Sequence, residues 1–420
     1  MKHVVIIGGG FGGVNLANKL AGQDGFSITL VDRNNYNFFP PLLYQIATGF
    51  LEVSNISYPF RKLFRKKKIN FHLGELETII PSERKVILTT GEIRYDYLVL
   101  ATGVQSNYFG IENVRENALP MKTLHDALEL RNHILQQLEL AAIETDEVRR
   151  KKLLNIVVVG SGPTGVEISG MLADMRKYIL PKDYPEIAGK GYTPHIYLVD
   201  ALDTVLNSMS DRSHDDAFKA LTEMGVEIKL HMQVKDYMDD IVVFSNGETI
   251  ATKTLVWAAG VTGFVFSGMP PDSYGSGKRI LVDEFNRVRG LDNVFVIGDA
   301  CIQHHEQKFP SGHPQLAQVA IQQGINLAKN LPAMERGGAL KAFAYWDKGS
   351  MAIIRRNKAV VDLASNRIHF SGFIAWLMWL FVHLFSLIRH RNRVTTFFNW
   401  AIAYFTRDQP LRLIIRPSKK

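Results

Sequence analysis

Short runs of consecutive apolar residues recur along this chain, and most of them end at glycine or at an acidic residue. Runs of this form occupy residues 4–7, 97–100, 156–159 and 294–297, and residues 26–31 form a similar run that includes Ser27 and Thr29. Uninterrupted apolar runs are typical of parallel strands that are buried on both faces. Stretches with helical character lie between these runs at residues 11–20 and 121–152, and another follows the last run at residues 314–330. The alternation of the two kinds of segment predicts an α/β fold with parallel sheets.

Two of the expected strands lead directly into glycine-rich loops with the spacing G-x-G-x-x-G. The first loop is Gly8-Gly9-Gly10-Phe11-Gly12-Gly13, and the second is Gly160-Ser161-Gly162-Pro163-Thr164-Gly165. Glycine is required where the backbone turns sharply and approaches a pyrophosphate closely. The helix behind each loop directs free N–H groups and the positive end of its dipole toward the phosphates. The chain is therefore expected to bind two dinucleotides.

An acidic residue at the end of the next strand would bind the ribose hydroxyls of each dinucleotide. Asp32 lies 19 residues after Gly13, close to the usual spacing, whereas Asp200 lies 35 residues after Gly165. An insertion at about residues 176–194 would account for the longer spacing. Because a carboxylate at Asp200 would repel a 2′-phosphate, and Ala201 stands where an arginine is typical of NADP enzymes, we expect NAD rather than NADP.

Composition limits the chemistry to bound cofactors. The 420 residues contain a single cysteine, Cys301, which excludes disulfide frameworks, Cys-x-x-Cys redox pairs and iron–sulfur clusters within this chain. Cys301 is expected to be a buried, inert thiol. His304 and His305 lack a third ligand nearby, so we expect no metal site. The length predicts two or three domains.

Two further segments, together with the loops, resemble the two-dinucleotide-binding flavoproteins. They are the strand end Ala101-Thr102-Gly103 and the strand end Gly298-Asp299. The resemblance covers about residues 1–330 and implies two Rossmann-like domains of the glutathione-reductase type. It implies that the first loop binds FAD, that the second binds NADH, and that Asp299 contacts the ribityl chain. The FAD site would comprise Gly8, Gly10, Phe11, Gly12, Gly13, Asp32, Arg33, Ala101, Thr102, Gly103, Gly298, Asp299, Ala317 and Gln318. The NADH site would comprise Gly160, Gly162, Pro163, Thr164, Gly165, Glu167, Asp200 and Gly260.

Three shorter segments resemble the type II NADH:quinone oxidoreductases in particular. They are residues 162–167, residues 317–324 and residues 346–352, the last followed by Ala359-Val360. This resemblance implies that Glu167, Gln318 and Lys348 act near the flavin. The chain departs from the family pattern at Gln315-Leu316, where the family often has Pro-Thr, and at Arg355-Arg356, where it commonly has Gly-Arg.

The implied domain boundaries follow the positions of these motifs. A discontinuous FAD-binding domain would cover residues 1–112 and 263–330, and a helical connection residues 113–152. The NADH-binding domain would cover residues 153–262. Residues 331–420 would form a membrane-associating region with amphipathic helices.

The C-terminal region combines aromatic residues with positive charge. Residues 373–388 are almost wholly apolar but shorter than the ~20 residues that span a bilayer. Residues 389–420 carry eight Lys or Arg and one acid, so they hold nearly all of the formal net charge of +8. A buried domain or dimer helix, a transmembrane helix and a membrane-surface helix are the alternatives. Aromatic rings beside cations favour a helix on an anionic membrane surface over the other two, and over a nucleic-acid site.

These features predict a peripheral, monotopic membrane enzyme that passes electrons from NADH through FAD to a quinone, menaquinone or ubiquinone, without pumping protons. The first strand begins near His3, so we expect no targeting segment and a location on the cytoplasmic face of the cell membrane. A homodimer through the aromatic C-terminal segment is expected, and no nucleic-acid partner. The alternative is a soluble NADH-dependent flavin reductase that passes electrons to ferredoxin or another protein acceptor, although it would have no use for residues 370–420.

Overall fold

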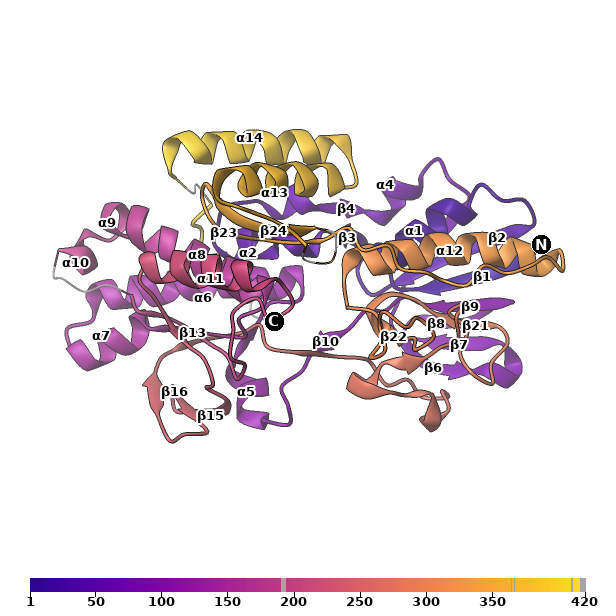
Figure 1. Ribbon diagram of the computed structural model, residues 1–420, viewed down its shortest axis with the longest axis horizontal. Coiled ribbons are helices and arrows are strands. Elements are labelled where there is room, and N and C mark those ends of the chain that lie inside the picture. The colour runs from indigo at the N-terminus through magenta and orange to yellow at the C-terminus, as the bar shows by residue number, and fades with distance from the viewer. Residues whose placement is uncertain (190–193, 364, 366, 409–410, 416–420) are drawn as a thin grey trace. The chain divides into compact units, whose positions relative to one another are not determined.

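A computed structural model of the chain describes residues 1–189, 194–363, 365, 367–408 and 411–415. The chain divides into two compact units, which are described separately. The first unit comprises Met1–Phe38, Tyr58–Gln105 and Val261–Asp347, and the second comprises Phe39–Ser57, Ser106–Gly260 and Lys348–Lys420. The class is α/β in both units, as the alternation of strands and helices predicted (Figure 1).

The first unit is built on a five-stranded parallel sheet in the order β21-β9-β1-β2-β5. Its strands are β1 (Lys2–Ile7), β2 (Phe26–Asp32), β5 (Ile69–Leu73), β9 (Tyr97–Leu100) and β21 (Val294–Val296). Helices α1 (Phe11–Leu20) and α12 (Ala317–Glu335) cover one face, and β6 (Leu76–Ile80), β7 (Lys85–Leu88) and β8 (Gly91–Arg94) form a small antiparallel sheet on the other (Figure 1).

The central strand β1 shows why its sequence is apolar at every position. Val4 and Ile6 pack with the helices, whereas Val5 and Ile7 pack on the opposite face with residues of the small sheet. Alternate side chains of a strand point to opposite faces, so a strand covered on both sides has no solvent-facing positions. All four side chains are buried, which confirms the prediction of a buried parallel strand.

The second unit repeats this architecture with a parallel sheet in the order β11-β18-β12-β13-β14. The strands are β11 (Leu119–Pro120), β12 (Ile156–Val159), β13 (Ile196–Val199), β14 (Val226–Lys229) and β18 (Thr254–Trp257). The main helices are α6 (Leu124–Ile143), α7 (Glu147–Leu154), α8 (Pro163–Tyr178) and α11 (Asp211–Glu223). The predicted insertion before Asp200 contains α9 (Leu180–Asp183) and α10 (Pro185–Ala188), and its residues 190–193 lie outside the described residues.

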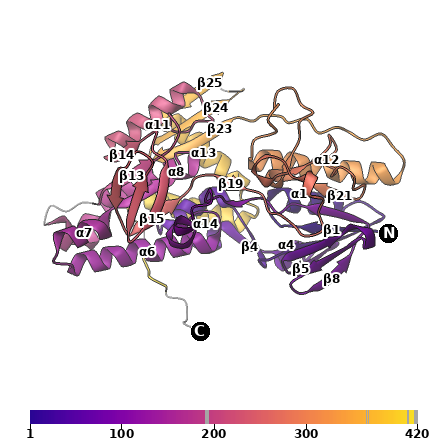
Figure 2. The same ribbon diagram turned by 90° about the horizontal axis from the view of Figure 1, so that it is seen from below.

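The C-terminal part of the second unit begins with strands that the sequence pattern did not predict. An antiparallel sheet of β23 (Ser350–Arg355), β24 (Lys358–Leu363) and β25 (Ile368–Ser371) packs against α8 and α11 (Figure 2). The predicted C-terminal region 331–420 therefore contains a small sheet before its helices. The two expected aromatic helices follow as α13 (Gly372–Ser386) and α14 (His390–Thr406), which lie side by side (Figure 1).

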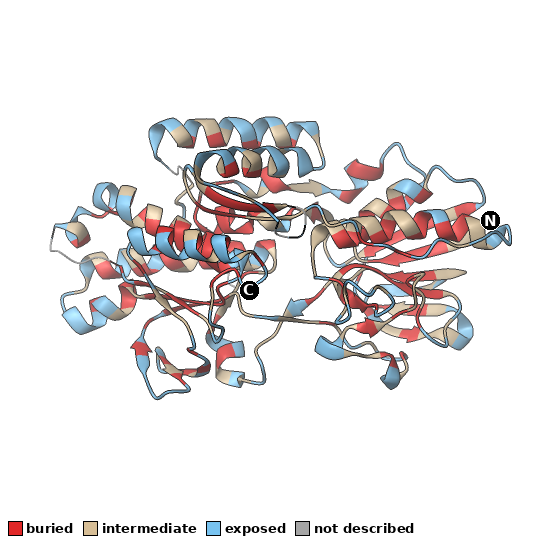
Figure 3. Cartoon of the chain, viewed as in Figure 1, coloured by how far each residue is buried: buried red, intermediate tan, exposed pale blue. Residues whose placement is uncertain are grey.

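Helices α13 and α14 are held by a few buried residues, and much of their remaining surface is exposed (Figure 3). Trp379 is fully buried, and Nδ2 of Asn392 donates to the carbonyl oxygens of Asn55 and Ser57 at 2.9 and 3.0 Å. These contacts attach the helices to residues 39–57, which fold as the short helices η1 (Pro40–Leu42), α2 (Leu43–Ala47) and α3 (Val53–Ile56) inside the second unit. None of the helices in the described residues is both long and apolar enough to span a bilayer.

Candidate functional site

The first glycine loop has the shape that its sequence predicted. Gly8 adopts φ +107°, and a Cβ atom at Gly13 would lie only 1.9 Å from the carbonyl oxygen of Gly8. Asp32, at the end of β2, accepts hydrogen bonds from the backbone N–H of Gly9 at 2.6 Å and of Asn34 at 2.7 Å. Burial raises the pKa of Asp32, while these two backbone donors oppose the increase. The carboxylate is therefore fixed beside the loop.

The second loop has the same construction in the other unit. Gly160 adopts φ +101°, and a Cβ atom at Gly165 would lie 1.7 Å from the carbonyl oxygen of Gly160. Asp200, at the end of β13, accepts from the backbone N–H of Ser161 at 2.5 Å and from its hydroxyl at 2.8 Å. The long spacing from Gly165 to Asp200 thus does not prevent the carboxylate from reaching its loop.

Both loops open onto helices whose first N–H groups face the loop. The N-cap residues of α1 and α8 are Gly10 and Gly162, which have no side chain to cap the helix. The first N–H groups of a helix lack intrahelical acceptors and are suited to bind an anionic phosphate. In the second loop Pro163 occupies the first turn of α8, where its missing N–H costs no hydrogen bond, and Thr164 follows it.

The remaining residues expected to bind the first dinucleotide lie at strand ends of the first unit. Ala101 donates its N–H to Ile7 at 2.7 Å, and Gly103 has φ +65°. The hydroxyl of Thr102 is buried without a hydrogen-bond partner among the described residues. An orphaned buried hydroxyl beside a glycine loop fits a site for a ligand with polar groups. Arg33 instead lies 3.7 Å from Glu75, with both side chains largely exposed.

Gln323, for which the sequence predicted no role, joins the turn after β21 to helix α12. Gln323 of α12 accepts from the N–H of Gly298 at 2.6 Å, which places the Gly298-Asp299 turn against the helix that begins with Ala317 and Gln318. The apolar environment raises the pKa of the Cys301 thiol to about 11, as expected for a buried, inert cysteine. The sequence alone does not distinguish a helical glutamine that makes such a buried contact from one that lies on the surface.

Glu167 and Lys348 lie in the second unit, and Gln318 lies in the first. Glu167 is buried in the first turns of α8, whereas Lys348 is exposed just before β23. Gly260 follows β18 with φ +67° and stands against the ring of Phe109. At the unusual Arg355-Arg356 pair, the Arg355 guanidinium lies 3.6 Å from Glu223, so this departure from the family pattern is accommodated by an ion pair.

Glu167 occupies an apolar environment that the C-terminal helices help to build. Burial raises the pKa of Glu167 to about 8, and the N–H of Ile353 and the indole of Trp379 only partly oppose this increase. The Ile353 N–H lies 3.5 Å from the carboxyl oxygen. The Trp379 N–H has no acceptor in good hydrogen-bond geometry among the described residues. It lowers the pKa of Glu167 because it lies close to the carboxyl group. A carboxyl with this pKa is largely protonated at neutral pH and can donate a proton.

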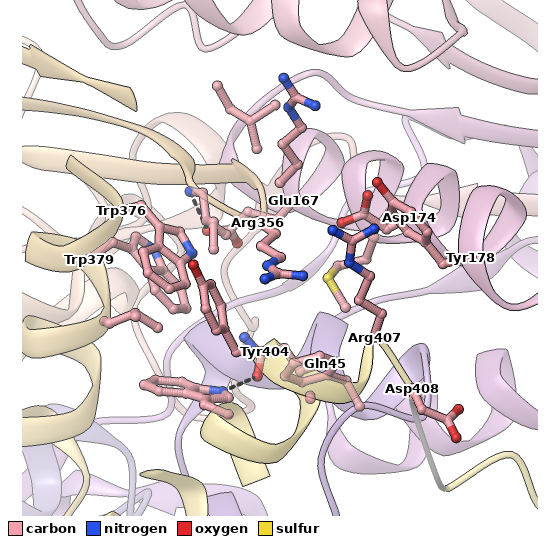
Figure 4. Close-up of a pocket in the computed structure, with 18 of the residues that line it drawn as sticks. Gln45, Glu167, Asp174, Tyr178, Arg356, Trp376, Trp379, Tyr404, Arg407 and Asp408 are labelled. Carbon is pink, nitrogen blue, oxygen red and sulfur yellow. Dashed lines mark hydrogen bonds between the residues drawn. The ribbon is translucent and has the colours of Figure 1, made fainter. Parts of the chain in front are cut away.

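Two polar residues close to Glu167, Tyr44 and Gln45, connect by hydrogen bonds to α14, and the sequence pattern predicted no function for either. Burial, and then the charge of Glu167, raise the pKa of Tyr44 well above its usual value. The side-chain amide of Gln45 donates to the Tyr44 hydroxyl at 2.8 Å, and its oxygen accepts from the Trp400 indole at 2.8 Å. Glu167 and Gln45 line one pocket together with Trp379 and Trp400 (Figure 4). In the sequence, these contacts are indicated only by the adjacent Tyr44 and Gln45 within the apolar stretch 36–50.

Comparisons with known proteins are consistent over nearly the whole chain. The family model described as "Pyridine nucleotide-disulphide oxidoreductase" matches residues 2–324, and the model "NDH2 C-terminal domain" matches residues 336–408. The chain is 36% identical over 96% of its length to the type II NADH:quinone oxidoreductase NdhA of Mycobacterium tuberculosis, covering 87% of that protein. It is 32% identical over 97% of its length to an internal alternative NAD(P)H-ubiquinone oxidoreductase of Arabidopsis thaliana, covering 85% of it.

A solved structure agrees with these relatives at the level of the fold. The structure of NDH2 from Plasmodium falciparum in complex with NADH superposes with a TM-score of 0.87 and covers 99% of this chain and 100% of that one, at 21% identity. The likeness extends through the C-terminal helices as well as the two dinucleotide-type units.

Proposed function

Because the chain belongs to the type II NADH:quinone oxidoreductases, within the pyridine nucleotide-disulphide oxidoreductases, we propose that it transfers electrons from NADH through bound FAD to a membrane quinone. The observation that carries the proposal is the pair of glycine loops, one in each unit, each with a strand-end carboxylate hydrogen-bonded to its backbone. The extent of the match through residues 336–408 favours a quinone over the alternative of a soluble reductase with a protein acceptor.

The first unit fits FAD. The open helix N-terminus behind Gly10, the Asp32 carboxylate and the orphaned Thr102 hydroxyl offer partners for pyrophosphate, ribose and other polar groups. We assign Asp299 to the ribityl chain and the residues of the first loop to the pyrophosphate. Bound FAD would accept a hydride and release two electrons, chemistry that belongs to the cofactor.

The second unit is proposed to bind NADH. The loop from Gly160 to Gly165 would bind the pyrophosphate, and Asp200 the ribose hydroxyls. Glu167 would hold a proton close to the reacting centre, Gln318 would hydrogen-bond a quinone carbonyl, and Lys348 would balance negative charge that develops during reduction. On this assignment residues 1–112 with 263–330 form the FAD-binding domain, residues 113–152 a helical connection, 153–262 the NADH-binding domain and 331–420 the membrane-associating region.

The proposed position of the enzyme is the cytoplasmic surface of the cell membrane, attached by α13 and α14. Exposed aromatic residues recur along both helices. Arg389 lies between them, and Arg391 and Arg393 lie in the first turn of α14. Aromatic rings at the interface and cations at anionic headgroups hold monotopic proteins on a bilayer. The basic residues Arg416, Lys419 and Lys420 lie outside the described residues. A homodimer is also proposed, and light scattering in mild detergent would measure its mass.

Anaerobic titration tests the proposed reaction directly. NADH should bleach the flavin absorbance of the purified protein, and a soluble ubiquinone or menaquinone analogue should restore it. Because Asp200 would repel a 2′-phosphate, NADPH should reduce the flavin at least about tenfold less efficiently. A colourless protein that retains no FAD after reconstitution would contradict the proposed function.

Glycine substitutions should separate the nucleotide loop from the rest of the fold. In the G13A variant the new methyl group would meet the Gly8 carbonyl oxygen at 1.9 Å, so the loop cannot keep its shape. We expect the flavin-to-protein absorbance ratio to fall by about tenfold or more, because the pyrophosphate contacts depend on this turn. In the matched G22A control the methyl group meets nothing within 4 Å, and full FAD occupancy is expected. Equal FAD content in both variants would contradict the assignment of the first loop.

A further inference from the structure

Four side chains of α8 line one cavity in the second unit. Glu167, Met171, Asp174 and Tyr178 follow one another at the helical intervals i, i+4, i+7 and i+11, so they lie on one face of the helix. Residues of β23, the turn after it, α13 and α14 form other walls, among them Arg356 of the turn, Trp379 and Tyr404 (Figure 4). The buried carboxyl of Glu167 therefore shares a cavity with the carboxyl of Asp174, which is only partly buried. A third carboxyl that lines the cavity, Asp408, is paired with the Arg412 guanidinium at 2.8 Å.

The two carboxyl groups are too far apart for direct proton transfer but are suitably spaced for transfer through water. Seven residues of α-helix correspond to a rise of about 10 Å. The cavity that both residues line has a volume of about 110 Å³. A water molecule needs about 10–15 Å³ measured in this way, so the cavity can hold several waters in a chain. The lining is mostly apolar, but Gln45, Asp174 and Tyr178 place polar groups along it, and these supply the hydrogen-bond partners that such waters require.

The proposed reaction requires a proton from the medium. Reduction of a quinone to a quinol consumes two electrons and two protons, whereas NADH supplies two electrons and one proton as a hydride. One further proton per turnover must therefore come from water. We propose that this proton enters through the α8 cavity, passing from solvent to Asp174, along cavity water to Glu167 and from Glu167 to the quinone oxygen. This inference rests on the proposed function and adds Asp174 as a positioning residue that resupplies Glu167.

The charges around the cavity set the direction of transfer. Burial raises the pKa of Asp174 to about 6, opposed by a backbone N–H bond from Arg356 and by the charges of Arg355, Lys177 and Arg356. Asp174 is thus mostly ionised at neutral pH and ready to accept a proton, whereas Glu167, facing Tyr44 and Trp379, mostly holds one. When Glu167 gives up its proton, Asp174 replaces it. Asp174 can do so only after it has itself taken up a proton from solvent.

Two arginines keep free hydronium out of this path. The Arg356 guanidinium lies over the Tyr404 ring at 3.9 Å, and Arg407 lies over the Tyr178 ring at 5.2 Å. Their positive charge opposes a hydronium ion in the cavity and stabilises a carboxylate. Transfer between carboxyl groups through neutral water is the route that these charges allow, which makes the titratable group at residue 174 necessary.

The test compares D174N, D174E and the parent protein, with D215N as a control at an exposed aspartate of α11. Stopped-flow absorbance follows flavin reduction by NADH and reoxidation by a quinone analogue separately from pH 6 to 9. In D174N we expect unchanged reduction but reoxidation slowed about tenfold, less than the effect of a group that transfers the proton to the substrate itself, because Asp174 acts through Glu167. D174E and D215N should behave like the parent. Azide, the small conjugate base of a weak acid, can carry protons into the cavity and should restore part of the rate in D174N.

A second measurement does not depend on turnover. Infrared spectroscopy after rapid mixing with D2O follows exchange of the Glu167 carboxyl proton, identified by its absence in E167Q. Exchange should be at least about tenfold slower in D174N than in the parent. Unchanged reoxidation or unchanged exchange in D174N would overturn the route through Asp174, and so would equal slowing of both flavin half-reactions. A parent protein that NADH reduces but no quinone reoxidises would instead contradict the proposed function.

Discussion

Replacing Phe381, Phe385 and Phe398 together by glutamate should abolish stable binding to anionic vesicles. The three side chains are 62%, 54% and 58% exposed on α13 and α14, so they contribute surface rather than core. Each phenylalanine inserted into a bilayer contributes about 1.5 kcal/mol or more, and the three together about 4.5 kcal/mol. A loss of this size weakens the partition coefficient about a thousandfold. Repulsion between the new carboxylates and anionic headgroups adds to it.

The measurement is co-sedimentation with vesicles of phosphatidylglycerol and phosphatidylcholine. A matched variant with glutamate at Leu140, Ile143 and Val148 introduces the same charge at exposed apolar positions of α6 and α7. That control should bind vesicles nearly as well as the parent, and both variants should retain FAD and reduce a water-soluble quinone analogue. Binding that falls equally in the two variants would indicate that net charge, rather than the α13–α14 surface, attaches the protein.

The glycine loops and their carboxylates could be predicted because the chemistry is encoded over a short stretch of chain. A positive φ at Gly8 and the close approach of Gly13 to the Gly8 carbonyl both demand glycine, and the demand appears in the sequence as a fixed spacing. Asp32 follows from the same reasoning, since the strand that carries it pairs directly with β1. An insertion lengthens the spacing between Gly165 and Asp200, but an acidic residue at a strand end was still sufficient to identify Asp200.

The environment of Glu167 could not be predicted, because it is assembled from distant parts of the sequence. The hydrogen bond from Trp400 to Gln45 joins residues 355 positions apart. The stripe through Met171 and Asp174 has helical spacing, but any helix packed on one side shows a similar stripe. The strands β23–β25 were missed for a related reason. In β24 the apolar run is only Ala359-Val360-Val361, so it shows neither the longer run of a strand buried on both faces nor the alternation of a strand with one exposed face.

Replacing Glu167 by glutamine should reduce quinone turnover by about 10² to 10³-fold, with the loss in flavin reoxidation. Glutamine keeps the size of the side chain and removes the transferable proton. In the parent, activity that depends on protonated Glu167 should be present below pH 8 and decline as the pH rises through about 8, the pKa of the buried carboxyl. E167Q should lack this alkaline decline. Stopped-flow reoxidation from pH 6 to 9 measures both effects.

The same substitution should change stability in the opposite direction, which separates a catalytic role from a structural one. The folded-state pKa of Glu167 is raised above its ordinary value of 4.5, so the folded protein binds a proton that the unfolded chain has released at neutral pH. Stability from this group is therefore full below about pH 4.5 and is lost as the pH rises through about 8. Because glutamine does not titrate, E167Q should denature at a higher urea concentration than the parent at pH 8, with FAD retained. A variant that is less stable at that pH and loses activity equally in both flavin half-reactions would contradict a proton-donating role for Glu167.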